Sequence, residues 1–331
     1  MRVSIALASY NGAAFVAEQL DSFAAQTRLP DEVIVSDDRS KDTTREIVSA
    51  FAERVPFEVR LVINHDRPGL VGNFSNALEH TTGDLVFLSD QDDVWAPEKI
   101  ARMTTLAEAY PEALCLMNDA WLADGALVVS GRSKLGEIRA AGLPDSAFVM
   151  GCCAVLRREL LDVALPIPPL MHAHDNWLVG IADQAGRVHR IAEPLQHYRL
   201  HGGNTSDFFV NRPRVPSRGA RLLQRLQRAL ARFSSTSGFE GEYRFHAALV
   251  AQLEEKPGFG TPEMRSALAA RLAVLSQRWD IRARPRLRRV GPVLRLWRQG
   301  GYGGGLGPVK DVILSGQPPR PTGQTRGCDE R

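Results

Sequence analysis

The chain has 331 residues, of which 44% are hydrophobic and 24% are charged, and its formal net charge is +3. This composition excludes wholesale disorder and collagen-like repetition, and the length allows about two domains of roughly 100 to 200 residues. The small net charge conceals an asymmetry: residues 1–210 carry 18 basic and 29 acidic side chains, whereas residues 211–331 carry 23 basic and 9 acidic ones. Such an asymmetry predicts two regions with different partners.

Membrane-spanning and secretory segments are not expected. The longest apolar stretch, residues 147–156, is half of the roughly 20 residues that a membrane-spanning helix needs. The N-terminus lacks the apolar core of a secretory signal. The four cysteines form no CxxC pair, and Cys152 and Cys153 point to opposite faces if their run is a strand. We therefore expect a cytoplasmic protein with reduced thiols.

The first hundred residues repeat a short apolar run, a polar turn and a segment of helical spacing. Strands are predicted over residues 3–7, 32–36, 58–63 and 84–89. Residues 16–23 and 43–55 place apolar side chains on one helical face, and Thr43 and Glu46 have the spacing of a capping box. Alternating strands and helices predict an α/β fold with a mostly parallel sheet.

Polar segments follow the four predicted strands, at the edge where open α/β sheets bind ligands. They begin at Ser9, Asp37, Asn64 and Asp90. The second and fourth strand ends alone contribute five carboxylates. Because like charges held together cost stability unless a cation or ligand offsets them, this edge is the predicted site of chemistry.

Asp90-Gln91-Asp92 is an Asp-x-Asp segment at the end of an apolar strand. Mg²⁺ and Mn²⁺ typically bind one or two protein carboxylates together with phosphate oxygens of a substrate. The segment therefore predicts a site for Mn²⁺ or Mg²⁺ with a diphosphate ligand.

The rear of the chain is basic and helical in pattern. Residues 218–233 predict an amphipathic helix rich in Arg, residues 264–279 predict a second helix, and an Arg cluster follows at 282–289. The stretch from residue 317 is rich in Pro and Gly, which predicts a disordered tail. The predicted domains are 1–210, a helical region 211–316 and a tail 317–331.

In its full context, FLSDQDDVW at 87–95, the Asp-x-Asp segment resembles the family 2 glycosyltransferases of the GT-A fold, particularly their rhamnosyltransferase-like branch. The resemblance covers about residues 1–205 and rests on several motifs in the family's order. It implies an inverting transferase that moves rhamnose or another deoxyhexose from a dTDP- or UDP-sugar. The implied acceptor is a hydroxyl of a cell-surface polysaccharide or lipid-linked glycan.

Three segments resemble the family's donor site: ASYNG at 8–12, SDDRSKDTT at 36–44 and the stretch 64–78. Arg39 stands where the family usually has Gly, and Asn73 replaces an Arg often found there. The resemblance assigns donor contacts to Ser9, Tyr10, Asn11, Asp37, Asp38, Asn73, Asp90, Gln91 and Arg199.

HDNW at 174–177 resembles the family segment whose Asp is the general base, which makes Asp175 the implied base. A helix beginning near Asp175 after a Pro-rich loop would present the carboxylate at its N-terminus. An ionised Asp there accepts the proton of the acceptor hydroxyl as that oxygen attacks the anomeric carbon. The alternative interpretation is a helix cap.

YRLHGGN at 198–204 resembles the family's Tyr-Arg-x-His-x-x-Asn signature. It implies that His201 joins Asp90 and Asp92 as a metal ligand or reaches the diphosphate, and that Arg199 lies against the same anion, which suits a bidentate guanidinium. The acceptor and sugar pocket is assigned to Trp95, His174 and Trp177, with simple packing as the alternative for the two Trp side chains.

Competing functions lack their motifs. Neither a P-loop nor a dinucleotide-binding fingerprint occurs. A nucleotide-sugar pyrophosphorylase would carry a Gly-rich basic loop after the first strand, where this chain has ASYNGAA. The Arg-rich rear could bind nucleic acid, but no reader motif is present, so no nucleic-acid partner is expected.

The basic rear has a second interpretation. Basic amphipathic helices near an anionic leaflet gain about 1 kcal/mol per suitably placed Lys or Arg. We therefore expect peripheral contact with the inner face of the plasma membrane, with a solvated helical extension as the alternative.

Overall fold

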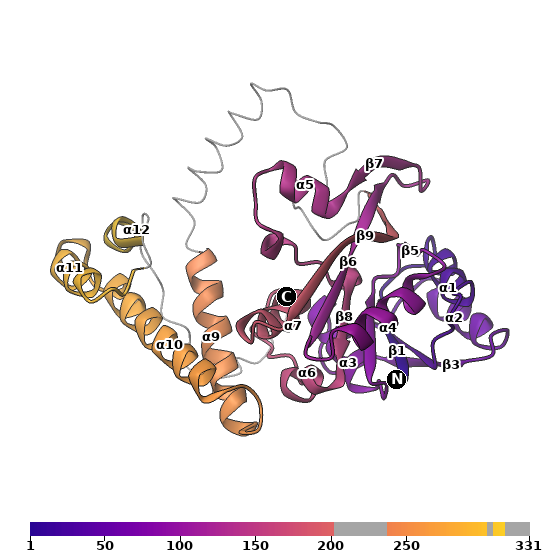
Figure 1. Ribbon diagram of the computed structural model, residues 1–331, viewed down its shortest axis with the longest axis horizontal. Coiled ribbons are helices and arrows are strands. Elements are labelled where there is room, and N and C mark those ends of the chain that lie inside the picture. The colour runs from indigo at the N-terminus through magenta and orange to yellow at the C-terminus, as the bar shows by residue number, and fades with distance from the viewer. Residues whose placement is uncertain (202–236, 303–306, 315–331) are drawn as a thin grey trace. The chain divides into compact units, whose positions relative to one another are not determined.

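A computed structural model describes residues 1–201, 237–302 and 307–314 (Figure 1). The chain divides into two compact units, the first comprising Met1–Val215 with Gln252–Gly260 and the second Pro216–Ala251 with Thr261–Arg331. The helix predicted over 218–233 and the tail predicted over 317–331 lie outside the described residues. The three predicted domain ranges therefore stay a prediction.

Four parallel strands form one half of the sheet in the first unit. They are β1 (Val3–Ser9), β2 (Glu32–Asp37), β3 (Glu58–Ile63) and β4 (Leu85–Ser89). Their spatial order is β3-β2-β1-β4. These are the four predicted strands, and their parallel pairing confirms the predicted α/β fold.

Beyond β4 the sheet is mixed. The order continues through β8 (Ala154–Arg157), β6 (Cys115–Ala123), β9 (Val188–Arg199) and β5 (Val94–Trp95), with β7 (Val129–Ser133) paired to β6. β8 runs antiparallel to both of its neighbours, whereas β6 and β9 are parallel. Cys152 and Cys153 lie in a buried 3₁₀ turn, η2 (Gly151–Cys153), before β8, so they do not alternate along a strand.

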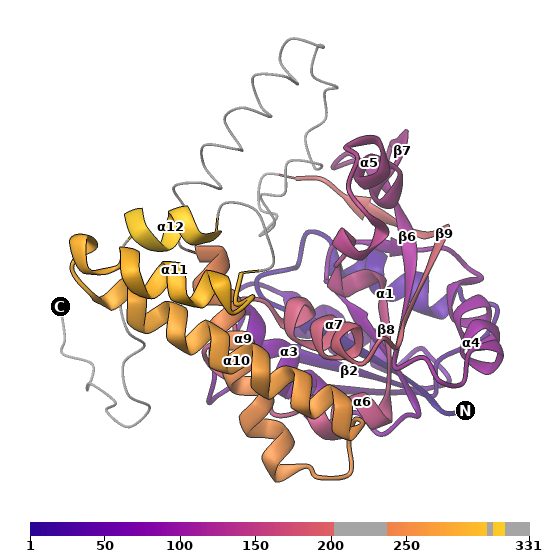
Figure 2. The same ribbon diagram turned by 60° about the vertical axis from the view of Figure 1, so that its left-hand side comes forward.

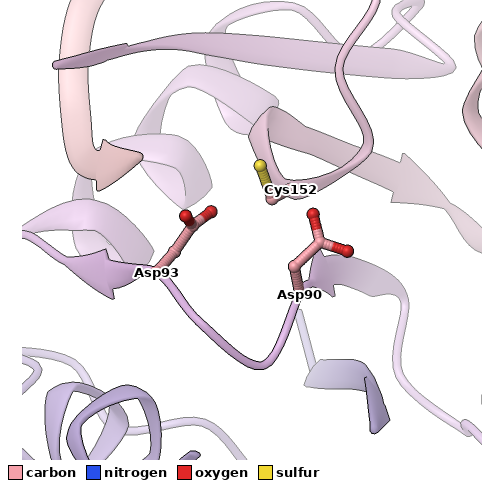
Figure 3. Close-up of side chains that lie close together, drawn as sticks. All are labelled: Asp90, Asp93 and Cys152. Carbon is pink, nitrogen blue, oxygen red and sulfur yellow. The ribbon is translucent and has the colours of Figure 1, made fainter. Parts of the chain in front are cut away.

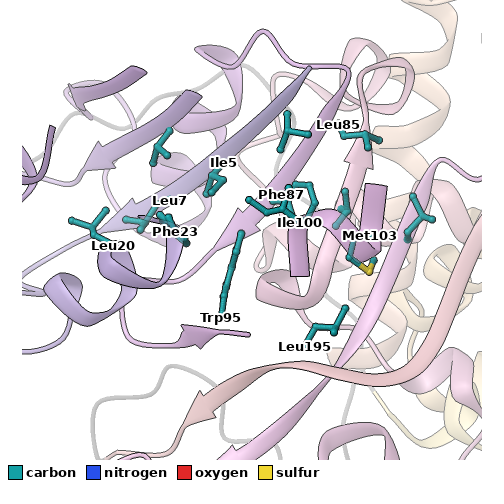
Figure 4. Close-up of a cluster of buried hydrophobic side chains, with 14 of the residues drawn as sticks. Ile5, Leu7, Leu20, Phe23, Leu85, Phe87, Trp95, Ile100, Met103 and Leu195 are labelled. Carbon is teal, nitrogen blue, oxygen red and sulfur yellow. The ribbon is translucent and has the colours of Figure 1, made fainter. Parts of the chain in front are cut away.

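Helices cover both faces of this sheet. α1 (Val16–Ala24), α2 (Thr44–Ala52) and α4 (Lys99–Ala109) bury their apolar sides in one cluster with the strands, shown in Figure 4. α3 (Leu70–Glu79), α6 (Arg158–Ala164) and α7 (His174–Gln184) pack together on the opposite face. α5 (Lys134–Ala140) and the short η1 (Asp145–Ala147) follow β7. Burial on both faces explains why β1 is buried at every position.

The N-terminus of α2 differs from the prediction. Thr43 precedes the helix without a capping hydrogen bond from its side chain, so the predicted capping box with Glu46 does not form. Asp42 takes the capping role, because its Oδ1 accepts from the backbone N–H of Thr44 at 3.1 Å. Thr44 in turn accepts from the N–H of Gly12 at 2.8 Å, which ties this helix to the loop after β1.

The second unit is helical in its described part. α10 (Pro262–Ala283) contains the predicted tract 264–279 and begins at Thr261, whose side chain accepts from Met264 N. α9 (Ser237–Glu255) precedes it, and η4 (Arg286–Arg288), α11 (Val290–Arg298) and α12 (Gly307–Ile313) follow. α10, α11 and α12 pack against one another (Figure 2).

One carboxylate organises this helical packing. Asp311 is fully buried and accepts from Arg282 Nε at 2.6 Å, Arg278 Nε at 2.8 Å and Tyr302 Oη at 2.9 Å. Arg289 donates to the carbonyl oxygens at the end of α12. Part of the basic cluster predicted at 282–289 is therefore interior and fixes α12 to α10.

Among the helices that the structure describes, none is both long and apolar enough to cross a bilayer.

Candidate active site

The loop after β1 and the loop after β4 are held together by one amide side chain. Gln91 Oε1 accepts from Tyr10 N at 2.9 Å, and Gln91 Nε2 donates to Tyr10 O at 3.1 Å. Any side chain at Gly12 would place its Cβ 2.1 Å from Gln91 Oε1, so the close approach requires Gly. Gln91, predicted to contact the donor, uses its amide to join the two predicted donor segments.

Asp37, at the end of β2, is fully buried and serves the turn that follows it. Its carboxylate accepts from Ser9 Oγ at 3.0 Å, from Ser40 N at 2.8 Å and from Ser40 Oγ. Arg39 in this turn has φ +62°, the left-handed conformation that Gly favours. The turn thus keeps the backbone shape that Gly would favour. Ser9 and Asp37 have a structural role here, and their contact with a donor stays a prediction.

Asn73 also makes its hydrogen bonds within the protein. It lies on α3 and is 3% exposed, its Nδ2 donates to Ser9 O at 2.9 Å, and its Oδ1 accepts from Ser36 Oγ at 2.6 Å. Both polar atoms are engaged within the protein, so the side chain fixes α3 to the strand ends, and its contact with a donor stays a prediction.

Five predicted donor residues retain accessible surface, namely Tyr10, Asn11, Asp38, Asp90 and Gln91. Tyr10 is 54% exposed, and Asn11 is exposed with φ +46°. Asp38 accepts from Asn64 Nδ2 at 3.0 Å and from Gly69 N at 2.7 Å, which orients its carboxylate at the edge of the sheet. These side chains stay candidates for donor contact.

The loop after β4 carries crowded carboxylates (Figure 3). A ligand atom of Asp90, one of Asp93 and the sulfur of Cys152 lie within 4.8 Å of one another and face a common space. Burial, together with the charges of Asp92, Asp93 and Asp175, raises the pKa of Asp90 well above its usual value. Burial and the charge of Asp92 raise the pKa of Asp93 to about 7. The ionised forms are thus destabilised, as expected where a bound cation supplies the missing charge.

A buried lysine orients Asp93. Lys99 donates to Cys152 O at 2.9 Å and to Gln196 Oε1, while Gln196 Nε2 donates to Asp93 Oδ2 at 3.0 Å. Burial lowers the pKa of Lys99 to about 8. This chain of hydrogen bonds fixes Asp93 against β9, so Asp93 anchors the loop after β4 to that strand.

The other end of the loop pairs with the chain that leaves β9. His201 Nε2 lies 2.7 Å from Asp92 Oδ2, and the centroid of its ring lies 4.8 Å from that of Phe15, with the two rings tilted by 30°. The structure therefore brings together Asp92 and His201, which the sequence assigns to the metal.

Arg199 is buried and makes several hydrogen bonds within the protein. Its side chain is 3% exposed, and it donates to Asp92 O at 2.9 Å, to Gly125 O at 2.7 Å and to the carboxylate of Glu18. The guanidinium holds the backbone of the Asp-x-Asp loop against α1 and the loop between β6 and β7, and the predicted diphosphate contact stays a prediction.

Asp175 lies in the first turn of α7, as predicted, and is partly exposed. The charge of Asp175 contributes to the raised pKa of Asp90. The predicted base is therefore electrostatically coupled to the Asp-x-Asp loop. Gly151 allows the first turn of α7 to pack against η2, because a Cβ at Gly151 would lie 2.5 Å from His174 Nε2.

The residues assigned to the acceptor pocket are buried instead. Trp95 is 3% exposed and packs in the core with Phe23, while Trp177 is fully buried and donates from its indole N–H to Ala164 O at 2.9 Å. His174 stacks on Phe74 at 3.7 Å, and burial lowers its pKa. The three side chains are buried, which agrees with packing, the alternative for both Trp side chains, and the acceptor-pocket assignment stays a prediction.

Sequence reasoning did not assign roles to Asp93, Lys99, Cys152 or Gln196. Asp93 adjoins the Asp-x-Asp segment and was detectable as part of one acidic cluster. The other three come from separate segments and carry no local signal, because only the packing of β9, η2 and α4 brings them beside the loop.

The fold and the carboxylate-lined strand ends define a GT-A-type α/β architecture, and comparison with known proteins agrees. The solved structure of S. aureus TarS 1–349 in complex with UDP-GlcNAc is similar, with a TM-score of 0.54 and 18% identity over 94% of this chain and 88% of that one. At this identity the likeness concerns the fold.

The model of glycosyl transferase family 2 matches residues 4–164. This chain is 32% identical over 180 residues to the Escherichia coli UDP-Glc:alpha-D-GlcNAc-diphosphoundecaprenol beta-1,3-glucosyltransferase WfgD, covering 53% of this chain and 67% of that protein. It is 32% identical over 163 residues to the Shigella flexneri dTDP-rhamnosyl transferase RfbG, covering 47% and 55%. The chain belongs to glycosyltransferase family 2, and the predicted resemblance is confirmed.

The chain spans 66% of the length of one curated relative and 59% of another that it matches.

Proposed function

We propose that this protein is an inverting glycosyltransferase that moves a sugar from a nucleoside diphosphate donor to an acceptor hydroxyl. The observation that carries the proposal is that Asp90, Asp92 and Asp175 lie at one end of the sheet. The negative charges of Asp92 and Asp175 disfavour ionisation of Asp90. A negatively charged donor binds at such an edge only when positive charge accompanies it.

The donor set fits Mn²⁺ or Mg²⁺. Hard carboxylate oxygens suit both ions, and the raised pKa of Asp90 is the expected response of a carboxylate awaiting a cation. Asp90, Asp92 and His201 would hold the ion. When bound, it supplies positive charge for the diphosphate of the donor and of the leaving group. Cys152 is a poor ligand for these ions, because contact with Cys153 and burial raise the pKa of its thiol well above its usual value.

Asp175 acts as the general base in this proposal. Its carboxylate Oδ1 accepts from Asn176 N at 2.8 Å, which orients it and leaves Oδ2 to take the acceptor proton. As the proton moves to Asp175, the acceptor oxygen attacks the anomeric carbon and the bond to the nucleoside diphosphate breaks. A single displacement inverts the configuration at that carbon.

The donor is proposed to be a dTDP- or UDP-sugar carrying rhamnose or another deoxyhexose, and the acceptor a lipid-linked glycan or cell-surface polysaccharide. The names of two relatives support this proposal. RfbG is named as a dTDP-rhamnosyl transferase, and the name of WfgD includes a diphosphoundecaprenol acceptor. If the acceptor is lipid-linked, the enzyme would act at the inner face of the plasma membrane.

A panel of UDP-, dTDP- and GDP-sugars tests the proposal. We expect release of nucleoside diphosphate from one donor class in Mn²⁺ or Mg²⁺, loss of release in EDTA, and a dTDP-deoxyhexose among the best donors. Formation of nucleoside triphosphate from pyrophosphate would instead identify a pyrophosphorylase. Full activity in EDTA would remove the metal role from Asp90 and Asp92.

A further inference from the structure

Helix α11 leaves a row of large apolar side chains in solvent. Val290 is 48% exposed, Leu294 44% and Trp297 56%, and Leu287 in the preceding turn is 96% exposed. The three helical residues recur at intervals of four and three, so they share one side of the helix. Trp297 is the most exposed of the five tryptophans of the chain.

This row is separate from the side of α11 that packs inward. Val293 and Leu296 are each 4% exposed and form a cluster with Ile281 and Tyr302. The inward side is therefore already covered within the second unit, and the exposed row is an additional apolar surface.

Positive charge borders the row. Residues 281–310 contain eight Lys and Arg and no Asp or Glu. Arg289 is buried, but Arg286, Arg288, Arg295 and Arg298 are exposed. Arg298 lies four residues after Leu294 and so adjoins the row on the helix surface.

We propose that the surface formed by Leu287, Val290, Leu294 and Trp297 with its exposed arginines docks on an anionic lipid bilayer. Trp is suited to the boundary between acyl chains and headgroups, the aliphatic side chains gain from insertion, and the arginines pair with lipid phosphates. A helix of this kind lies in the plane of the interface and does not cross the membrane.

Other occupants fit less well. Nucleic acid would use the arginines but gain little from three exposed aliphatic side chains. A second copy of this chain would bring two arginine-bordered surfaces together, and like charges in contact are destabilising. An anionic bilayer matches both the charge and the apolar row.

The docking surface deepens the proposed function, because it would hold the enzyme where lipid-linked acceptors reside. Its test does not depend on activity. The full chain is mixed with vesicles of phosphatidylcholine alone or with phosphatidylglycerol, and binding is measured by co-sedimentation. We expect binding to the anionic vesicles, a blue shift of tryptophan emission, and quenching by brominated acyl chains. Trp297→Phe should keep binding within about threefold while losing the blue shift.

Paired variants locate the surface. Leu294→Ser with Trp297→Ser should weaken binding at least about tenfold, because apolar insertion is lost. Arg295→Gln with Arg298→Gln should weaken it about 25-fold, from about fivefold per charge. Matched controls in the first unit are Leu29→Ser, at a residue 39% exposed, and Arg54→Gln with Arg139→Gln, which remove two exposed charges. The controls should bind like the parent, and all variants should keep donor hydrolysis and their circular dichroism.

Several outcomes overturn the proposal. They are equal binding to neutral vesicles, parental binding by both α11 pairs, or unchanged tryptophan emission on anionic vesicles. A dimer in sedimentation equilibrium that the Leu294/Trp297 pair dissociates would assign the surface to self-association. Binding of a DNA or RNA oligonucleotide at physiological salt that the arginine pair abolishes, without vesicle binding, would assign it to nucleic acid. Vesicle binding without donor hydrolysis would retain the docking surface while rejecting the proposed function.

Discussion

The two units treat buried carboxylates in opposite ways. In the second unit, Asp311 is surrounded by Arg278, Arg282 and the Tyr302 hydroxyl, so its charge is met by cations and donors. In the first unit, Asp90 lies among other carboxylates, and burial together with their charges raises its pKa. A buried carboxylate whose charge is neutralised by protein cations indicates a structural role. A cluster of carboxylates without nearby cations indicates a binding site for a ligand or a metal ion.

Removing Asp311 should have the largest effect on stability. Asp311→Ala leaves Arg282 buried without its carboxylate partner, and breaking a buried ion pair typically costs about 3 to 5 kcal/mol. Urea unfolding measured by tryptophan fluorescence checks this loss. Asp280→Ala is the matched control, because Asp280 is exposed on the same helix, α10. A loss below about 1 kcal/mol for Asp311→Ala would show that the cluster is not needed for stability.

Removing the proposed base tests the first unit by chemistry. Asp175→Asn should lower turnover at least about a hundredfold while leaving donor binding nearly unchanged, because general base catalysis contributes about 10² to 10⁴ in rate. Steady-state transfer and equilibrium donor binding measure the two effects. Asp183→Asn, on the same helix and paired with Arg190, should change turnover little. Retained activity in Asp175→Asn would refute the assignment.

Metal binding should depend on pH. Below its pKa a carboxyl group is protonated and binds a cation weakly. The pKa of Asp93 is raised to about 7, and that of Asp90 is also raised. The increase in melting temperature caused by Mn²⁺ should therefore be larger at pH 8 than at pH 5.5. At a concentration one hundredfold above Kd, the stabilisation is about 2.7 kcal/mol.

Variants separate this effect from general binding of Mn²⁺. Asp90→Asn with Asp92→Asn should abolish the shift, while Asp145→Asn, a surface residue paired with Arg139, should retain it. An equal shift at both pH values would contradict the link between metal binding and these carboxyls.

The smallest effect concerns the backbone at Arg39. Its φ of +62° costs a residue with a Cβ about 1 kcal/mol, so Arg39→Gly should be more stable than Arg39→Ala by about that amount. At Lys41, which has no positive φ, the order should reverse, with Ala at least as stable as Gly. Urea midpoints for the four variants measure the comparison. Equal stability of the two Arg39 variants would mean that the turn relaxes when the side chain is removed.

Local patterns predicted much of the first unit. The four parallel strands and, in the second unit, the tract within α10 follow from apolar spacing, since each pattern is contained in one segment. The Pro-rich loop predicted a helix that begins near Asp175, and α7 begins at His174. The mixed half of the sheet was not predicted. β6 pairs with β9 more than 70 residues later in the chain, and no local pattern encodes such a partner.

The sequence by itself determined which chemistry the chain carries: an Asp-x-Asp at a strand end, an Asp opening a helix, and a His after the last strand. Only the tertiary structure decided which polar groups are already satisfied. Asp37, Asn73 and Arg199 match the family's donor motifs, yet each already makes hydrogen bonds to distant segments of the chain. Burial and hydrogen bonding depend on neighbours in space. A motif therefore indicates which interactions a residue is able to make, and the packing around the residue determines whether its side chain is accessible.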